Sequence, residues 1–298
     1  MSTHSLRRTG RRYYLNDSTA PFSSAAGVAV ADWVSRVVAE GGDVPSDNTK
    51  NTLATFHQTL ATDGILNKMV NINCVVPDSL QAALTPFIAT HGSGSAGEGN
   101  SWANTNFTNP DLTIFGLKGD GTTKYLRTGI QISNIFSVNS MGITIYNTFS
   151  NTEAVNSGLD AGVLDFSSRI FRFAVNSADT CVFECYDTGT TRIAVATPLV
   201  GGLGYTSGNR TTSITSSVYV ASSVVTHGLI GINTGSLSAS PPLLELPIYC
   251  LNTTTTFNTI SPKQFSFIGI HFGLTQNESL AFYNAIQSMR ISLGGGYI

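Results

Sequence analysis

Ten short segments between residues 110 and 272 alternate apolar and polar residues, and no helical pattern lies between them. The predicted strands are Leu112–Leu117, Lys124–Arg127, Gly142–Phe149, Arg169–Val175, Thr180–Tyr186, Arg192–Ala196, Thr212–Val220, Thr226–Ile232, Leu246–Leu251 and Phe265–Phe272. Turn residues such as Gly119-Asp-Gly121 separate them. Strands joined by short turns pair antiparallel, so this feature predicts a mainly β, antiparallel jelly-roll sandwich over residues 101–298.

The composition agrees with a β-rich chain. Charged residues make up 11% of the sequence, less than half of the roughly 25% usual for soluble domains. Ser, Thr and Asn supply 91 residues, and hydrophobic residues make up 41%. Such a chain favours strands and turns. The low charge argues against an ordinary cytosolic enzyme, and the apolar content argues against disorder.

Residues 26–100 are predicted to form a small helical region followed by a linker. Trp33 and Val37 belong to an apolar pattern with helical spacing. Ser46 and Asp78 can cap two further helices, and a glycine-rich stretch then leads into the sandwich. Three short amphipathic helices must bury their apolar faces against something larger. We expect them to cover one sheet of the sandwich.

The C-terminal segment has the clearest local signature in the chain. Thr275 and Glu278 form a capping box ahead of apolar residues at helical spacing, and Gly294 begins a glycine stop. The pattern predicts a terminal helix packed on the sandwich.

Residues 1–25 are predicted to be an extended basic arm. Its candidate anchoring residues are Arg7, Arg8, Arg11, Arg12, Tyr13 and Tyr14. Such a segment cannot bury a core of its own, so we expect it to dock on a neighbouring chain. An arm folded back on its own domain is the alternative. Four arginines in isolation are weak support for nucleic-acid binding, which we do not expect.

The sequence gives no sign of a membrane segment or a disulfide framework. No apolar run approaches the roughly 18 residues of a membrane-spanning helix, and no secretory signal is recognisable. Cys181 and Cys185 lie four apart on one predicted strand, which places them roughly 13 Å apart. That distance excludes a disulfide between them. We expect the four cysteines to be buried free thiols.

Three stretches of the sequence are distinctive: Val30–Gly42, Gly116–Gly129 and Gly273–Ile286. Together and in this order, they resemble a family of bacteriophage virion proteins with a laminin-G-like, concanavalin-like sandwich. The resemblance spans roughly residues 26–296 and implies a structural or adhesive role in the virion. It implies no defined chemistry. The anchoring role of the arm is inferred separately from its composition.

Aromatic side chains near amides are the candidate glycan contacts. Sugar rings stack on aromatic faces, and their hydroxyls need polar partners. The low-charge sequence offers Trp102 with Asn104, Tyr146, and Tyr205 with Asn209. Each also has a packing role as an alternative. Trp102, for example, can pack at the junction between the helical region and the sandwich.

Catalytic and metal-binding patterns are weak. Asp120 is a possible calcium ligand, but calcium prefers several clustered carboxylates, and Asp160, Asp165 and Asp187 are the other contributors. We assign no metal site and no cofactor. The histidines are scattered, and no pair of facing carboxylates can be nominated for glycoside hydrolysis. No catalytic residue is assigned.

These observations lead to three functional hypotheses. The first is a phage appendage of tail or head, anchored in the virion by its arm and presenting a lectin-like sandwich to a host-surface glycan. The second is a capsid decoration protein without a receptor. A carbohydrate-active enzyme has the least support. Low charge also suits a permanently packed subunit, so we expect a homo-oligomer and a trimer in particular.

Overall fold

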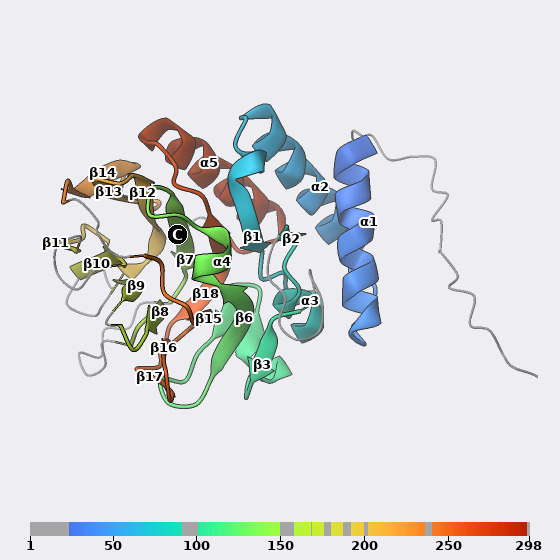
Figure 1. Cartoon of the computed structure of the whole chain (residues 1–298). Coiled ribbons are helices and arrows are strands. Elements are labelled where there is room, and N and C mark those ends of the chain that lie inside the picture. The colour runs from blue at the N-terminus through green and yellow to red at the C-terminus, as the bar shows by residue number, and fades with distance from the viewer. Residues whose placement is uncertain are drawn as a thin grey trace, which may run out of the picture.

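The computed structural model describes residues 24–90, 101–149, 158–167, 169–175, 180–186, 192–199, 202–235 and 240–296. The six candidate anchoring residues of the arm lie outside this range: Arg7, Arg8, Arg11, Arg12, Tyr13 and Tyr14. The chain forms two sheets that pack face to face, with helices on one side (Figure 1). No helix within the described residues is long and apolar enough to cross a membrane.

The first sheet, here called sheet A, supports the helices on its outer face. Its strands in spatial order are β14 (Gly228–Asn233), β13 (Thr215–Ala221), β12 (Gly204–Thr212), β7 (Met141–Asn147), β18 (Gln264–His271), β1 (Met69–Asn73) and β2 (Ile88–Ala89). Beside this path, β18 also pairs with β5 (Gly116–Lys118), which pairs with β4 (Leu112–Thr113). Strand β1 comes from the predicted helical region, so that region and the sandwich share one sheet.

The second sheet, here called sheet B, closes the sandwich. Its strands in spatial order are β11 (Ile193–Ala196), β10 (Thr180–Cys185), β9 (Ile170–Val175), β8 (Ala161–Leu164), β15 (Glu245–Ile248), β6 (Tyr125–Gln131) and β3 (Ala103–Thr105). At one end, β16 (Leu251–Thr253) pairs with β8 and with β17 (Phe257–Asn258). The β16–β8 pairing is parallel, and the other pairings among the named strands are antiparallel.

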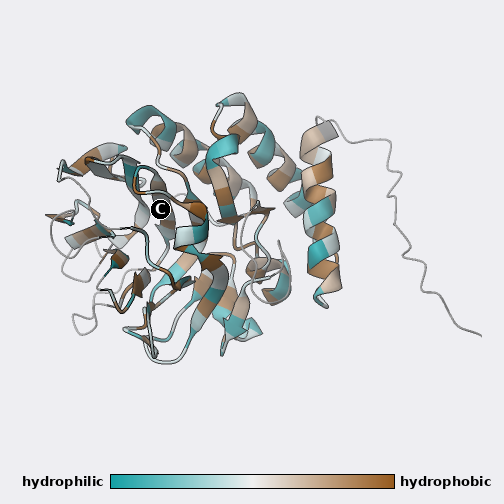
Figure 2. Cartoon of the chain, viewed as in Figure 1, coloured by the Kyte–Doolittle hydropathy of each residue, from teal (hydrophilic) through white to brown (hydrophobic). Residues whose placement is uncertain are grey.

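Alternate residues of both sheets fill the space between them. Phe171, Phe173 and Phe183 from sheet B meet Ile143 and Ile268 from sheet A, all at most 3% exposed. Figure 2 shows hydrophobic residues in the central strands and along the first helix, with more hydrophilic residues on the other two long helices. Burial of such side chains contributes roughly 1.5–3 kcal/mol each, so this layer contributes strongly to stability.

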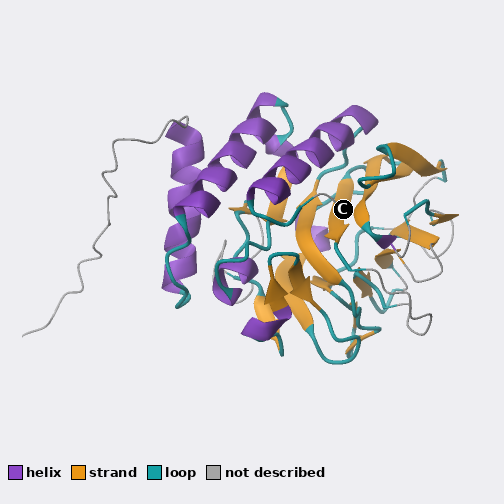
Figure 3. Cartoon of the chain, turned by 180° about the vertical axis from the view of Figure 1, so that it is seen from behind, coloured by secondary structure: helices purple, strands orange, loops and turns teal. Residues whose placement is uncertain are grey.

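Three long helices gather on the outer face of sheet A (Figure 3). They are α1 (Ser24–Ala39), α2 (Asp47–Thr62) and α5 (Gln276–Ser292). Phe267 of β18 lies between them, with ring centroids 6.0 Å from Phe56 of α2 and 5.5 Å from Phe282 of α5. The short elements are η1 (Leu66–Lys68), α3 (Leu80–Leu84), η2 (Asn109–Asp111) and α4 (Ile132–Ile135).

The mainly β sandwich with an N-terminal helical layer and a C-terminal helix is confirmed. The side chain of Ser46 caps α2, and the reciprocal bonds of Thr275 and Glu278 cap α5, as the sequence predicts. The third helix is capped by Ser79, one residue after the predicted Asp78. The helices cover one sheet because their apolar side chains join those of its outer face in one buried cluster.

Strands β2, β3, β8, β12 and β17 were not predicted from the sequence, and β16 overlaps a predicted strand only at Leu251. Strand β12 carries Tyr205, Ser207 and Asn209 on the face that the helices cover, so polar side chains are buried there and the alternation disappears. On its inner face, a Cβ atom at Gly208 would lie 2.3 Å from the ring of Phe183. Glycine is therefore needed where sheet B approaches.

Candidate functional site

Most of the predicted glycan contacts lie inside the protein. Tyr146, Tyr205 and Asn209 each have an exposed fraction of 0%, and Trp102 is 2% exposed. A side chain without exposed surface cannot stack on a sugar, so these four assignments are wrong. Their aromatic and amide chemistry serves the packing of the helices instead.

Tyr146 and Tyr205 anchor α5 on sheet A. The hydroxyl of Tyr146 accepts a hydrogen bond from Nε2 of Gln287 (3.0 Å), and the guanidinium of Arg290 lies 3.8 Å from its ring centroid. The hydroxyl of Tyr205 lies 2.9 Å from Oγ of Ser279. These contacts satisfy buried polar atoms, which accounts for tyrosine on this face.

Asn209 and Trp102 have comparable packing roles. Oδ1 of Asn209 accepts a hydrogen bond from the backbone N–H of Leu274 (2.9 Å), which fixes the turn before α5. Trp102 packs in the inter-sheet core together with Val75 and Leu84 from the helical region. The structural alternative for Trp102, a plug at the junction, is the observed arrangement.

Asn104 is the one candidate of this group that is exposed. Its amide nitrogen donates to the carbonyl of Phe107 (2.9 Å), and its amide oxygen accepts from the N–H of the same residue (2.9 Å). Both polar groups thus close a local turn.

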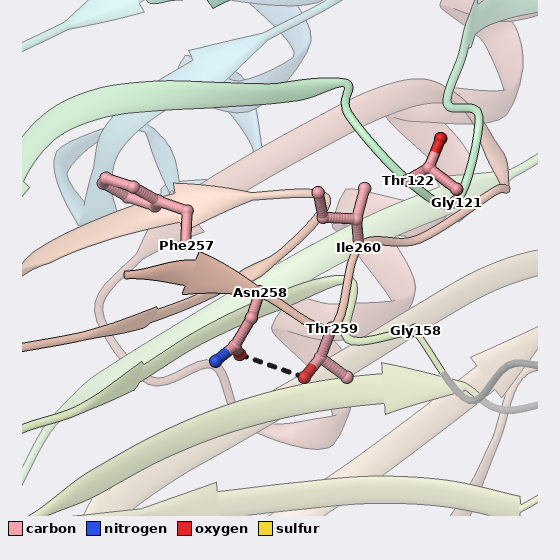
Figure 4. A pocket seen from close by; sticks show the side chains of 7 residues that line it. All are labelled: Gly121, Thr122, Gly158, Phe257, Asn258, Thr259 and Ile260. Atoms are coloured by element: carbon pink, nitrogen blue, oxygen red, sulfur yellow. Dashed lines mark hydrogen bonds between the residues drawn. The ribbon is translucent and has the colours of Figure 1, made fainter. Parts of the chain in front are cut away.

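An open pocket of about 350 Å³ lies at the end of the sandwich where β17 leads towards β18. Its lining residues are Gly121, Thr122, Gly158, Phe257, Asn258, Thr259 and Ile260 (Figure 4). In Figure 4, the side chains of Asn258 and Thr259 point to the same side of the strand, and those of Phe257 and Ile260 point the other way. The volume falls within the roughly 300–1,000 Å³ of small-molecule sites.

Asp120 holds the loop that contributes Gly121 and Thr122 to one wall of the pocket. Its Oδ1 accepts hydrogen bonds from the backbone N–H groups of Thr122 (2.9 Å), Thr123 (2.7 Å) and Lys124 (3.0 Å). Its Oδ2 accepts from the hydroxyl of Thr123 (2.6 Å). Burial alone would raise the pKa of this carboxyl, but these hydrogen bonds outweigh it and hold the pKa far below its usual range. The loop that presents Thr122 is therefore held by a permanent anion.

The opposite wall is the segment Phe257–Ile260, which is fixed from two sides. The ring of Phe257 stacks on Tyr125 of β6 with centroids 4.8 Å apart and planes 16° apart. The N–H of Leu159 donates to the carbonyl of Thr259 (2.9 Å). A Cβ atom at Gly158 would lie 2.5 Å from the carbonyl oxygen of Ile260, so glycine permits this close approach.

A buried ion pair joins this wall to the core. Nζ of Lys263 lies 2.7 Å from Oδ2 of Asp160, and the two side chains are 6% and 2% exposed. Oδ1 of Asp160 also accepts from the hydroxyl of Ser261 (2.9 Å), and Oδ2 accepts from the N–H of Val175 (2.9 Å). The residues that follow Gly158 and Ile260 are thus connected to β9, and the wall is rigidly supported.

The pocket lining carries hydrogen-bonding groups but no ionisable side chain among the described residues. Oδ1 of Asn258 accepts a hydrogen bond from Oγ1 of Thr259 (3.1 Å), and Nδ2 of Asn258 donates to Oγ1 of Thr256 (3.4 Å). The exposed amide of Asn258 keeps one further N–H and one further oxygen lone pair. Thr122 adds a hydroxyl to the lining, and Ile260 adds apolar surface. Such a lining suits a neutral polar molecule, and the described lining residues include no ionisable side chain for general acid or base chemistry.

The carboxylates considered for calcium have other partners. Asp120 is used within its loop, Asp160 pairs with Lys263, and Asp165 forms an ion pair with Arg169 (2.6 Å). Asp187 lies outside the described residues. The part of the chain that the structure describes contains no group of three or more side chains suited to a metal ion.

The sequence indicated only half of the pocket. The Gly119-Asp-Gly121 turn signal marks the loop of one wall, and Asp120 organises it as its side-chain chemistry suggests. The wall with Asn258 and Thr259 has no comparable motif. It was missed because a pairing between segments a hundred residues apart creates it.

Comparisons with known proteins give structural likeness alone. No protein-family model matches the chain, and no curated protein sequence matches it. A carbohydrate-binding module of the IT-sialidase of Ruminococcus gnavus, bound to α2,3-sialyllactose, aligns with 12% identity and a TM-score of 0.42. The alignment covers 56% of this chain and 96% of the module.

Domain 4 of an extracellular arabinanase from Geobacillus stearothermophilus, in complex with arabinotriose, aligns with 11% identity and a TM-score of 0.42. It covers 72% of this chain and 98% of that domain. The sialidase of Trypanosoma rangeli has 10% identity and a TM-score of 0.41, over 79% of this chain and 39% of its own. Similarity this distant does not locate a ligand, and the site rests on the geometry described above.

Proposed function

We propose that this protein is a binding module for a neutral, hydroxyl-rich glycan, which it holds in the pocket between Thr122 and Asn258. The observation that supports the proposal is a pocket of about 350 Å³ whose side chains are amide, hydroxyl and apolar. Sugar hydroxyls both donate and accept hydrogen bonds. Beyond its bonds to Thr256 and Thr259, the exposed amide of Asn258 keeps one N–H and one oxygen lone pair for such a hydroxyl. Ile260 lines the same pocket on the other side of the segment from Asn258 (Figure 4), and it offers apolar surface for a sugar ring there.

The rigidity of both walls favours binding. Asp120 holds the Thr122 loop through four hydrogen bonds, and the Asp160–Lys263 pair supports the opposite segment. The backbone of this pocket is already ordered before a ligand binds. The entropic cost of ordering the site on binding is therefore small.

The virion role predicted from the family resemblance remains a proposal. A host-attachment appendage needs an accessible ligand pocket, and a capsid decoration protein does not. Binding of the chain to intact host cells would favour the appendage, whereas docking on virions that lack the protein, without binding to cells, would favour the decoration role.

A glycan array probed with the labelled full-length chain is the first test of the proposed function. Hits are then measured in solution with the wild type and with Asn258→Ala. Loss of a neutral hydrogen-bonding partner should weaken binding by about tenfold. Asn51→Ala is the matched control, because Asn51 is an exposed amide on α2 in a separate groove.

Equal affinity of the wild type and Asn258→Ala for every hit would contradict the proposal. Binding only to glycans that carry a charged group, with no binding to neutral glycans, would also contradict it. The control variant should retain wild-type affinity, which shows that loss of an exposed amide has no general effect.

A further inference from the structure

Strand β14 forms an edge of sheet A. Within the described residues it pairs on one side only, with β13. Its inner face is closed, since a Cβ atom at Gly231 would lie 2.6 Å from the side chain of Ile193 on β11. An edge strand offers unpaired backbone groups to another strand.

A bulge places two aliphatic side chains of β14 on the same face. The register shifts between Val218 and Tyr219, so Ile232 lies opposite Ser217 and Leu229 lies opposite Tyr219. Residues three apart on a regular strand point to opposite faces. Here both point to the outer face of sheet A, where Leu229 is 44% exposed and Ile232 is 59% exposed. The bulge therefore creates a short apolar surface beside this edge of the sheet.

The segment around β14 lacks the charges that usually protect an edge. Residues 211–244 contain no Asp, Glu, Lys or Arg, and Gly228–Asn233 contains no proline. In a two-fold contact the same surface patch meets its own copy, so a patch with charges of one sign would repel itself. A charge-free edge avoids that cost, which favours a second copy of the chain over a charged partner.

We propose that β14 pairs antiparallel with β14 of a second copy across a two-fold axis, which joins the two A sheets. With the axis between Ile230 and Gly231, Leu229 of one chain lies opposite Ile232 of the other. Two apolar cross-strand pairs then form per dimer. This contact builds a dimer in place of the trimer expected from the sequence, and it is independent of the glycan pocket.

The test is the mass of the full-length chain in solution over a range of concentrations, measured by sedimentation or light scattering. The wild type should approach twice the chain mass of 31.5 kDa as concentration rises. Ile232→Lys places two buried charges in each dimer and should weaken association by about a hundredfold. Val44→Lys is the control, because Val44 is 60% exposed and lies after α1, far from β14 in the sequence.

Three results would overturn the inference. The first is a wild type that stays monomeric at the highest soluble concentration, and the second is a trimer. The third is a dimer that Ile232→Lys leaves intact. Thermal unfolding of each variant is measured alongside, and Ile232→Thr serves as a milder second variant that also weakens association.

Discussion

The helix-covered face of sheet A and the loop end of the sandwich use similar side chains for different purposes. The covered face holds Tyr146, Tyr205 and Asn209, which are fully buried and bonded to α5 or to the turn before it. The loop end holds Thr122 and Asn258, which are exposed and line a pocket. Aromatic and amide residues therefore indicate a binding surface only when the covering elements are known.

The largest effect on stability should follow truncation of a buried side chain on the covered face. Tyr146→Ala removes a buried ring that contacts Arg290 and Gln287. The cavity that the missing ring leaves should lower the free energy of unfolding by about 4 kcal/mol. Urea denaturation measures this change. The folded fraction should bind glycan normally. If Tyr146→Ala had wild-type stability but no longer bound glycan, the covered face would serve binding and not stability. That result would contradict the comparison.

A somewhat smaller effect is expected beneath the pocket. Lys263→Met leaves the carboxylate of Asp160 buried without its cation, which should cost about 3 kcal/mol of stability. Because the pair supports the pocket wall, glycan affinity should fall too. The double variant Asp160→Asn/Lys263→Met should recover part of the stability. A Lys263→Met protein with unchanged stability would show that the pair does not support the wall.

The two regions should also differ in their response to pH. His271, on the covered face, lies 2.9 Å from Oγ1 of Thr144, and burial lowers its pKa to about 4. The unfolded chain, with a histidine pKa of roughly 6.5, takes up the proton first. The contribution of neutral His271 to the free energy of unfolding is therefore complete above about pH 6.5. It is lost as the pH falls from there towards 4, by at most about 3 kcal/mol.

Denaturation at pH 7 and pH 4.5 measures this slope, and His271→Gln should reduce it. His57 and His227 also have lowered pKa values because they are partly buried, so some slope should remain. Glycan affinity should stay constant over the pH range in which the protein is folded, since the described lining has no ionisable side chain. A glycan affinity that falls with pH in parallel with the free energy of unfolding would contradict this difference between the two regions.

Local signals predicted the three long helices, α3 and most strands. The capping box at Thr275 and the cap at Ser46 depend on neighbours a few residues away, so the sequence reveals them. Strand β12 was hidden because α5 covers its polar residues, and burial of both faces removes the alternation. The pocket was hidden for a related reason: Gly158 and Ile260 meet only through the fold.

The most direct test of the central claim is an amide NMR titration of the folded full-length chain with the best glycan from the array. We predict that the largest shifts fall on residues 120–123 and 257–260, with little change at Tyr205, Asn209 and α5. Shifts concentrated on the covered face, or spread evenly over the sandwich, would contradict the assignment of the pocket as the binding site.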